Sequence, residues 1–346
     1  MRNGTNIEKT SPDLAPFGRH RVVLPVYIPS DEGYFSQSRQ VLRLCLESLR
    51  RTTSGRVSVS IVSNGSIPSV NDELREHYES GWIDQLLINR RNWGRVDAVA
   101  AVIRGTFEPL ITVSDADVFF RTGWLDAIED LFTRFPECGS ASPVPLPEAL
   151  WHYTSATILG GIVRRELSFR KIVPDDDLDR FARSIGRPDM YGPDSRAAQL
   201  VVQRGGAYAC VGCGHFVCTI RREVVESMPR EPSLRALGGR ASERWLDIPP
   251  DRAGFWRLST TRAYAWHMGN TPEPWMHDEL AALPEPPAAV GELAPISPPR
   301  LRWTSRLPWR ARRLLTQGVK KTRLRPVFFR TLGHPHHTTS TIPRSA

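Results

Sequence analysis

Two hydrophobic periodicities alternate along the first third of the chain. Residues 21–29 (RVVLPVYIP) form a β-branched apolar run, and residues 40–51 place apolar side chains at helical spacing among polar ones. Residues 56–66 (RVSVSIVSNGS) form a second apolar run, which stops at an Asn-Gly pair. A strand, a helix and a second strand in such close succession predict a βαβ unit with parallel strands.

The same alternation continues up to a strand that precedes an acidic triplet. We expect helices over residues 70–80 and 97–104 and strands over residues 85–88 and 110–113. This pattern predicts an α/β fold with a doubly wound, mainly parallel sheet, and ligands of such sheets bind beyond the carboxyl ends of the strands. The residues that follow the strands are the candidates for chemistry, namely Tyr27, residues 63–65, residues 89–95 and residues 114–117.

The periodicity becomes less regular after residue 143. We expect short helices over residues 177–185 and 195–203, an apolar segment over residues 208–220 and a turn-rich segment over residues 242–267. These elements predict an irregular second half built onto the same sheet, followed by Pro-rich and then basic sequence. The predicted parts are a lead-in over residues 1–19, a first half over 20–142, a second half over 143–271, a linker over 272–299 and a tail over 300–346.

Composition excludes several classes of protein. The chain has 346 residues, of which 40% are hydrophobic and 24% are charged, so it is not disordered throughout. It lacks the roughly 20 consecutive apolar residues that a membrane-spanning helix needs, and residues 1–17 lack the apolar core of a secretory signal. Five cysteines, an odd number, argue against a disulfide framework. We therefore expect a cytoplasmic protein, with the inner face of the cell membrane as a further option.

Basic charge is concentrated at the C-terminal end. Residues 300–346 hold 12 of the 46 Lys and Arg residues and no Asp or Glu, so the preceding residues carry a small net negative charge. The body of the protein therefore gives no electrostatic sign of nucleic-acid binding. Cations mixed with Trp and Leu over residues 300–330 suit peripheral contact with an anionic membrane. Nucleic-acid binding by this tail and packing of the tail on the body are the alternatives.

A pair of carboxylates, Asp115 and Asp117, directly follows the predicted strand LITVS. Oxygen ligands at this position suit Mg²⁺ or Mn²⁺ bound together with a diphosphate, because the metal neutralises phosphate charge that carboxylates alone would repel. The alternative is an acidic, solvated loop or a helix cap. The position after a buried strand, at the edge where ligands bind, favours the metal site.

The order and spacing of five motifs resemble the family 2 glycosyltransferases. The motifs are VVLPVYIP, CLESL, IVSNGS, NRRNWGRVDAVAAVI and SDADVFF, and the resemblance extends over residues 21–270. It implies the GT-A fold and an inverting transfer of a sugar from a nucleotide diphosphate donor, assisted by one divalent cation, Mn²⁺ or Mg²⁺. The implied partners are a nucleotide-sugar donor and a saccharide or lipid-linked acceptor, without nucleic acid.

The resemblance also implies roles for individual residues. Asp117 matches the metal-binding carboxylate, and Asp115 matches the one that faces the donor ribose or a metal-bound water. His267, in AYAWHMGN, matches the late histidine that completes the metal site. The positions that match donor-binding loops are Pro25, Tyr27, Ile28, Ser63, Asn64, Asn92, Gly94 and Arg95.

Several of these assignments carry alternatives. The family position that reads the nucleobase is usually Asp and is here Ser63, so Asn64 is the more plausible polar reader and the identity of the base stays open. Gly94 would let the chain pass close to the donor. Arg95 approaches the diphosphate or pairs with a surface acid. His267 ligates the metal or packs among aromatic residues.

An inverting transfer needs a group that removes the proton of the acceptor hydroxyl. The segment SERWLDIPPDRAGFWRLS resembles the family stretch that supplies this carboxylate. Asp247 is the first choice, and Asp251 and Glu243 stay open because the adjacent prolines leave the register unsettled. Each of the three could instead be a helix cap or an exposed acid.

The segment CVGCGHFVC holds His215 and three of the five cysteines, Cys210, Cys213 and Cys218. A structural zinc site needs a second pair of ligands, and none is evident, so we expect small buried cysteines. The two glycines of this segment would leave space for an acceptor. Aromatic residues that stack on a sugar or are simply buried are Trp151, His152, Tyr153 and Trp245.

The sequence thus predicts a metal-dependent glycosyltransferase. One alternative is a sugar-phosphate nucleotidyltransferase, which needs a Gly-rich loop directly after the first strand that VYIPSDEGY does not provide. The other is a non-catalytic carbohydrate- or membrane-binding protein on the same scaffold. The joint presence of Asp115, Asp117 and His267 argues against this second alternative.

Overall fold

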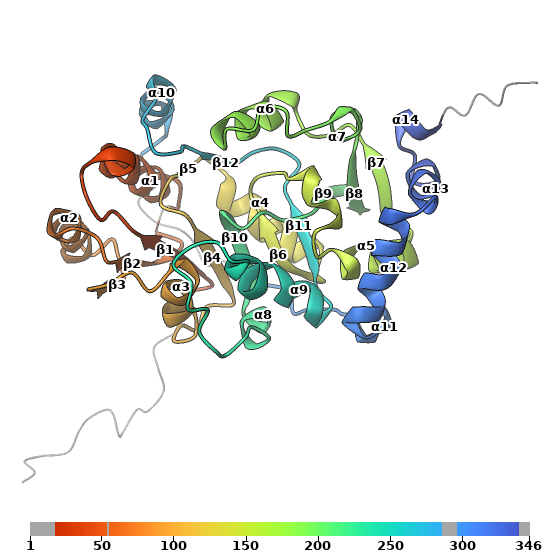
Figure 1. Cartoon of the computed structure of the whole chain (residues 1–346), viewed down its shortest axis with the longest axis horizontal. Coiled ribbons are helices and arrows are strands. Elements are labelled where there is room, and N and C mark those ends of the chain that lie inside the picture. The colour runs from red at the N-terminus through yellow and green to blue at the C-terminus, as the bar shows by residue number, and fades with distance from the viewer. Residues whose placement is uncertain (1–17, 54, 286–295, 339–346) are drawn as a thin grey trace, which may run out of the picture.

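A ten-stranded sheet forms the centre of the computed structural model, which describes residues 18–53, 55–285 and 296–338. The strand order is β3-β2-β1-β4-β10-β6-β11-β9-β8-β7, and helices lie on both faces of the sheet (Figure 1). A two-stranded sheet, β12-β5, lies beside the carboxyl end of β4. These elements confirm the α/β class predicted from the sequence.

The first four strands are parallel and alternate with helices along the chain. The elements are β1 (His20–Val26), α1 (Ser38–Thr53), β2 (Ser58–Asn64), α2 (Pro68–Glu79), β3 (Gln85–Asn89), α3 (Arg95–Ile103) and β4 (Leu110–Ser114). All seven occur where the hydrophobic pattern predicts them. In α1, for example, Val41, Cys45 and Leu49 are buried against the sheet, as their helical spacing requires.

Strands of the second half join the sheet by mostly antiparallel pairing. They are β6 (Cys138–Ser142), β7 (Leu167–Arg170), β8 (Gln199–Arg204), β9 (Ala207–Val211), β10 (Val217–Arg221) and β11 (Trp256–Ser259), while β5 (Val118–Phe120) and β12 (Ala265–His267) form the small sheet. β10 runs antiparallel between β4 and β6. This insertion brings the turn before β10 next to the end of β4, because the Asp115 amide donates to the Phe216 carbonyl at 2.7 Å.

The helices of the second half are short. They are α5 (Ser155–Arg164), α6 (Asp175–Ser184), α7 (Pro193–Ala197), α8 (Arg222–Glu226) and α9 (Ile248–Ala253), with single turns at η3 (Pro147–Trp151) and η4 (Glu243–Asp247). The first half also contains the single turn η2 (Gly33–Phe35) before α1 and the helix α4 (Trp124–Arg134) before β6. α6 confirms the helix predicted over residues 177–185. The irregular second half is therefore observed, and it contributes three antiparallel strands to the far edge of the sheet.

The helix predicted over residues 195–203 is wrong. α7 ends at Ala197, and β8 begins two residues later at Gln199. Leu200, Val201 and Val202 are buried between β7 and β9, with which β8 pairs on both sides. Apolar β-branched residues favour a strand where two neighbouring strands can pair with it, and tertiary pairing decides the outcome here.

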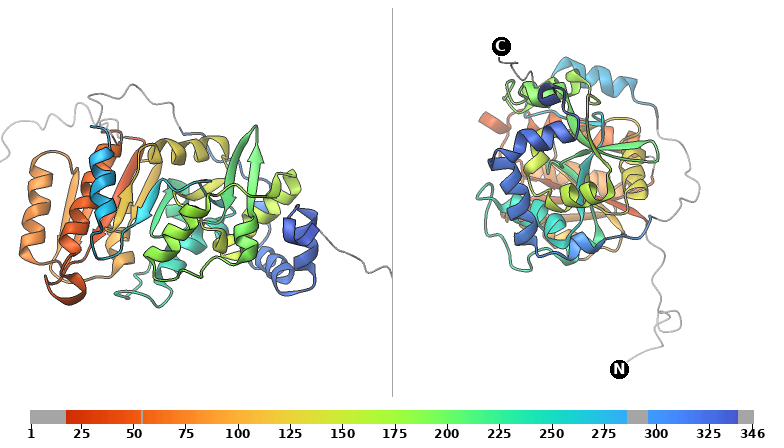
Figure 2. Two further views of the ribbon diagram at one scale, coloured as in Figure 1. Left: turned by 90° about the horizontal axis from the view of Figure 1, so that it is seen from above. Right: turned by 90° about the vertical axis from the view of Figure 1, so that its right-hand side faces the viewer.

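Two segments beyond the body pack against it. α10 (Pro274–Ala282), inside the segment predicted as a linker, buries Met276 and contacts α1. α11 (Trp303–Arg306), α12 (Trp309–Lys321), α13 (Leu324–Thr331) and α14 (Pro335–Thr338) cover the end of the sheet near α5 and β7 (Figures 1 and 2). Packing on the body, one of the options for the tail, is thus observed for these helices. Most of the predicted lead-in (1–17), part of the linker (286–295) and the end of the tail (339–346) lie outside the described residues.

A buried arginine anchors the tail. The Arg312 side chain is fully buried, and its guanidinium donates to the carbonyls of Leu307 at 2.9 Å and Asp251 at 2.5 Å. The Trp309 indole donates to the Asp251 carboxylate at 2.9 Å, and Phe329 packs on Phe169. These contacts make α12 and α13 part of the folded body.

The five cysteines all lie in the described part of the chain, where they are buried and form no disulfide. This confirms the expectation of small core residues. In the described ranges, no helix has the length and apolar character that crossing a membrane requires.

Candidate active site

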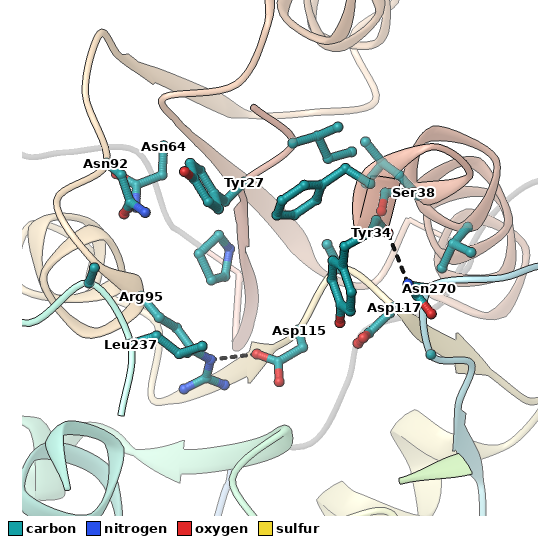
Figure 3. A pocket seen from close by; sticks show the side chains of 18 residues that line it. Tyr27, Tyr34, Ser38, Asn64, Asn92, Arg95, Asp115, Asp117, Leu237 and Asn270 are labelled. Carbon is teal, nitrogen blue, oxygen red and sulfur yellow. Dashed lines mark hydrogen bonds and ion pairs between the residues drawn. The ribbon is translucent and has the colours of Figure 1, made fainter. Parts of the chain in front are cut away.

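A cleft of about 500 Å³ opens at the carboxyl ends of the parallel strands (Figure 3). Its size is that of an ordinary small-ligand pocket. Most of the predicted donor-site and metal-site residues line it, namely Pro25, Tyr27, Ile28, Asn64, Asn92, Arg95, Asp115 and Asp117. The fold therefore gathers residues from four separate loops at the edge where the sequence predicts a ligand.

The two aspartates reach the cleft because β4 ends just before them and β5 begins just after them. β12 pairs antiparallel with β5 and places His267 opposite Val118. The His267 Nε2 atom lies 3.4 Å from the Asp117 Oδ2 atom. Within the described residues, Asp117 Oδ1 and His267 Nδ1 are buried and have no hydrogen-bond partner. Two metal-ligating groups thus stand side by side with unused polar atoms.

The pKa of Asp117 is raised to about 6. Loss of hydration in the cleft is the main cause, and the negative charge of Asp115 adds to it, while His267 and Arg95 act in the opposite direction. A carboxylate that is costly to ionise alone, next to a second carboxylate, is the electrostatic setting that a bound cation relieves.

Arg95 joins the two sides of the cleft. Its Nε atom donates to Asp115 Oδ1 at 2.5 Å, and its Nη2 atom donates to the His215 carbonyl at 2.7 Å. The third nitrogen, Nη1, is buried and has no partner in the part of the chain that the structure describes. Arg95 therefore pairs with an acid, but that acid belongs to the cleft, and Nη1 keeps a donor for an anion.

The asparagines of the donor loops bind one another. Asn64 Nδ2 donates to Asn92 Oδ1 at 2.9 Å, and Asn64 Oδ1 accepts from Asn89 Nδ2 at 3.2 Å and from the Trp93 amide at 3.0 Å. Asn64 is therefore engaged within the protein, although it borders the cleft. Ser63 is fully buried, donates to Asn71 at 2.5 Å and does not line the cleft, so its predicted contact with the donor is not observed.

Gly94 allows a close backbone contact that the sequence did not predict. Its φ of +85° favours glycine, and a Cβ atom here would lie 1.9 Å from the Arg235 carbonyl oxygen. The loop over residues 233–237 therefore crosses Gly94 closely, and Asp97 accepts hydrogen bonds from Ser233 and Leu234 that hold this loop. The loop lines the cleft through Ala236 and Leu237. The close approach at Gly94 is to this loop, not to the donor as predicted.

Tyr34 and Asn270 also line the cleft, and sequence reasoning missed both. The Asn270 side chain donates to the Tyr34 carbonyl at 2.9 Å, and Figure 3 shows this bond beside Asp117. The residues are 236 positions apart in sequence. Nothing local marks this contact, so only the position of Asn270 at the end of the motif AYAWHMGN hinted at a role.

A second pocket of about 440 Å³ lies beside the first and shares its border at His267. It is lined on one side by His152 and His215, and on the other by Phe181 and Ile185. His152 and His215 are each 46% exposed at the side chain. The expectation that Gly214 leaves space near a substrate agrees with this pocket, which Gly214 lines.

Asp247 lies directly beneath these histidines. Its side chain is 2% exposed, and its Oδ1 atom accepts from Arg257 at 2.7 Å. Its Oδ2 atom lies 2.9 Å from His215 Nδ1 and 3.4 Å from His152 Nε2. Burial by itself would raise the pKa of Asp247, but the charge of Arg257 and the bonds to both histidines hold the pKa well below its usual range. Asp247 is therefore a fixed anion, and the group it presents to the pocket is His215.

The other two candidate bases have different settings. Asp251 is fully buried, and its carboxylate accepts from Ser155, the Ala156 amide and Trp309, so it anchors helices and has no access to an acceptor. Its prediction as a base is thus contradicted by its position. Glu243 binds Tyr153 and Arg240, and these hydrogen bonds lower its pKa to about 2.

The aromatic residues proposed for sugar stacking divide into two groups. Tyr153 and Trp245 are buried, and Trp151 packs on Phe328 of the tail. These three residues therefore follow the second option given for them, which is packing inside the protein. Of these four residues, only His152 lines the second pocket beside the cleft. His215 is the functional candidate that sequence reasoning missed. The available signal was its position after the two glycines of CVGCGHFVC and just before a buried strand.

Residues 33–174 match the family model described as glycosyl transferase family 2. The chain carries a glycosyltransferase family 2 domain. For residues 33–174, this match confirms the resemblance to family 2 glycosyltransferases that the sequence predicts. No curated protein sequence matches the chain significantly.

Several solved structures are similar to this chain. The mannosyltransferase PcManGT from Pyrobaculum calidifontis, in complex with GDP-Man and Mn²⁺, has 14% identity and a TM-score of 0.40, covering 77% of this chain and 62% of that one. S. aureus TarS 1–349 has 10% identity and a TM-score of 0.42, covering 77% and 70%. Its complex with UDP-GlcNAc has 10% identity and a TM-score of 0.41, covering 77% and 65%. This chain thus spans less than two thirds of the mannosyltransferase, and its own donor, acceptor and metal are matters of proposal.

Proposed function

We propose that this chain transfers a sugar from a nucleotide diphosphate donor to a hydroxyl group, with inversion at the sugar carbon and with one divalent metal. The observation that carries the proposal is that Arg95, Asp115 and Asp117 line one cleft, with His267 of the neighbouring pocket 3.4 Å from Asp117. Two carboxylates, an imidazole and a guanidinium complement a diphosphate bound with a metal. The family 2 domain over residues 33–174 supports the same class of reaction.

Asp117 and His267, with Asp115 beside them, would hold the metal. The fit rests on their donor set, on the 3.4 Å separation of Asp117 Oδ2 and His267 Nε2, and on the unpartnered Asp117 Oδ1 and His267 Nδ1 atoms. A bound Mn²⁺ or Mg²⁺ would neutralise charge on the diphosphate leaving group. Arg95 would bind a diphosphate oxygen through Nη1 while its other donors stay on Asp115 and the His215 carbonyl.

The nucleoside would lie at the other side of the cleft. Figure 3 shows Tyr27, Asn64 and Asn92 together there, apart from the two aspartates. The polar atoms of Asn64 are hydrogen-bonded within the protein. The exposed ring of Tyr27 is therefore the better surface for the nucleobase. Stacking of this kind tolerates several bases, and the nucleotide itself has to be measured.

The acceptor would occupy the second pocket, with His215 as its base. The acceptor hydroxyl attacks the sugar carbon, the bond to the diphosphate oxygen breaks, and the nucleoside diphosphate leaves. His215 Nε2 takes the hydroxyl proton, since Nδ1 faces Asp247 at 2.9 Å. Asp247, predicted as the base, acts through His215 in this proposal, because its buried charge orients the ring and stabilises the imidazolium that forms.

The tail would bring the enzyme to a membrane that carries a lipid-linked acceptor. α12 exposes Leu314 and Leu315, and α13 exposes Leu324 and Val327. Exposed cations surround them, including Arg310, Lys320, Lys321, Arg323 and Arg330. Apolar side chains among cations suit the surface of an anionic bilayer. This contact uses the outer side of helices whose inner side packs on the body.

Calorimetric titration with UDP, GDP and dTDP, each with Mn²⁺ and with EDTA, tests the donor site. We expect one nucleotide to bind in a metal-dependent way, and Asp117→Asn to abolish that dependence. Asp130→Asn removes an exposed carboxylate that is paired with Arg134 on α4, and it is the matched control.

Three other outcomes would contradict the proposal. Metal-dependent binding that survives Asp117→Asn would place the metal elsewhere. Binding of glycans without any nucleotide would favour the non-catalytic carbohydrate-binding alternative. Release of pyrophosphate from a nucleoside triphosphate and a sugar phosphate would favour the nucleotidyltransferase.

A further inference from the structure

Three histidines near the C-terminal end of the described chain gather around one aspartate. The motif His334-Pro335-His336-His337 forms the start of α14, which packs beside α7 at the edge of the sheet (Figure 1). Asp194, in the first turn of α7, faces this motif. This cluster lies at the opposite end of the molecule from the donor cleft, and neither the family domain nor the proposed transfer uses it.

The distances within the cluster match those between ligands of one metal ion. One ligand atom from each of Asp194, His334 and His337 lies within 4.8 Å of the other two. His337 Nε2 lies 3.4 Å from Asp194 Oδ2, and His336 Nδ1 lies 3.3 Å from Asp194 Oδ1. Two ligands bound to Zn²⁺ at 2.0–2.1 Å in tetrahedral geometry are about 3.3 Å apart. The separation of His337 and Asp194 therefore already fits two ligands of one zinc ion, and His334 offers a ligand atom within 4.8 Å of both.

His334 adds an independent sign of a ligand. The residue is fully buried against Phe169 and Phe329, yet its Nδ1 atom has no hydrogen-bond partner in the described ranges. Its other ring nitrogen lies 3.1 Å from the Asp194 carbonyl. Burial lowers the pKa of His334, so the ring is neutral and keeps a lone pair. A buried polar atom without a partner is costly, and a metal ion is one way to satisfy the ring.

We propose that Asp194, His334 and His337 form a zinc site that fastens the tail to the body. Nitrogen ligands from two histidines and one carboxylate oxygen are a donor set that suits Zn²⁺ better than Mg²⁺ or Mn²⁺. The proposal is independent of the transfer reaction proposed above.

A zinc ion at this site would also affect the proposed acceptor pocket. Asp194 follows a loop from which Ile185, Arg187 and Met190 line that pocket. Zinc at Asp194 would tie this wall of the pocket to α13 and α14, and so to the tail. The tail would then hold a fixed position relative to the site where the acceptor binds.

Calorimetric titration of Zn²⁺ into the chelator-treated full-length chain tests the site. The titration uses the Asp117→Asn background, which removes the proposed donor-site metal and keeps the two sites distinct. We expect one equivalent of Zn²⁺ to bind, and a rise in the thermal unfolding midpoint that depends on it. Co²⁺ in place of Zn²⁺ should give the visible absorption of a tetrahedral site.

His337→Ala is the decisive variant, because His337 is partly exposed and its loss leaves the fold intact. We expect zinc affinity to fall by more than about 100-fold, beyond the loss caused by residues that only orient a ligand. His277→Ala, an exposed histidine on α10, is the matched control and should bind normally. Unchanged zinc binding in His337→Ala, or no zinc binding before the substitution, would overturn the proposal and leave an ion pair between Asp194 and protonated histidines.

Discussion

At the scale of single residues, the donor cleft depends on groups whose neighbours change their chemistry. Asp117 is the clearest case, because lost hydration and a second carboxylate oppose its ionisation. Arg95 and His267 offset this cost without removing it. A residue kept in an unfavourable electrostatic setting is a sign of function, since stability alone would favour a neutral side chain there.

Metal binding by this cleft should fail in mild acid. A proton and a metal compete for Asp117, whose raised pKa of about 6 favours the proton in the metal-free fold. Binding should therefore be complete above this pKa and weaken about tenfold for each pH unit below it. Titration of Mn²⁺ at pH 5, 6 and 7.5 checks this, and an affinity that stays flat over the range would contradict it.

The proposed base can be separated from its neighbour by two matched variants. His215→Asn should lower kcat by about 100-fold or more, since a general base contributes 10²–10⁴-fold, and should leave the KM for the donor nearly unchanged. His152→Asn removes the other exposed imidazole above Asp247, at 3.4 Å, and should have a much smaller effect. Equal losses in the two variants would contradict a specific role for His215.

At the scale of elements, the cleft is assembled by loops that are close in space and far apart in sequence. The antiparallel insertion of β10 brings His215 to Arg95, and the pairing of β12 with β5 brings His267 to Asp117. The loop over residues 233–237 closes one side of the cleft by crossing Gly94. Each contact joins the irregular second half to the regular first half.

Replacement of Gly94 should test this loop. Gly94→Ala would place a Cβ atom 1.9 Å from the Arg235 carbonyl oxygen, so the loop must move away from the cleft. We expect nucleotide affinity to fall by about tenfold in calorimetry, roughly 1.4 kcal/mol. Gly81→Ala is the control, because it has a similar φ of +79° and open space around its Cβ position. The same affinity in both variants would show that the loop does not shape the cleft.

At the scale of the whole molecule, α1 lies toward one end of the sheet and the tail helices cover the other (Figure 2). Residues of α1 and of the loop after β1 line the cleft. This arrangement gives the tail two sides. Arg312 and Phe329 face the body and are buried, while Leu314 and Leu315 face outward.

The outward side should carry membrane binding. Substitution of both Leu314 and Leu315 by Ser should reduce cosedimentation with vesicles that contain anionic phospholipid, because about 0.8 kcal/mol is lost for each buried CH₂ group. Leu234→Ser, another exposed leucine on a different surface, is the control. Binding that is equal in all variants, or equal with neutral vesicles, would leave the tail as a purely structural element.

The first half of the chain could be predicted from sequence because its determinants are local. Strand and helix periodicities repeat within a few residues, so β1 to β4 and their helices follow from the hydrophobic pattern. Asp115 and Asp117 are marked by the strand before them, and His267 by its motif. The second half resisted prediction where pairing partners decided the structure, as at β8, where a helix was expected.

The sequence by itself determined the α/β class and the resemblance to family 2 glycosyltransferases, and it singled out the candidates for metal and diphosphate binding. Tertiary structure alone decided that Asp247 is a buried anion behind His215, that Asp251 anchors the tail, and that Gly94 accommodates a loop. It also brought Asp194 to a histidine motif 140 residues away. The physical reason is that burial, ion pairing and close approach depend on distant partners, whereas periodicity depends on neighbours along the chain.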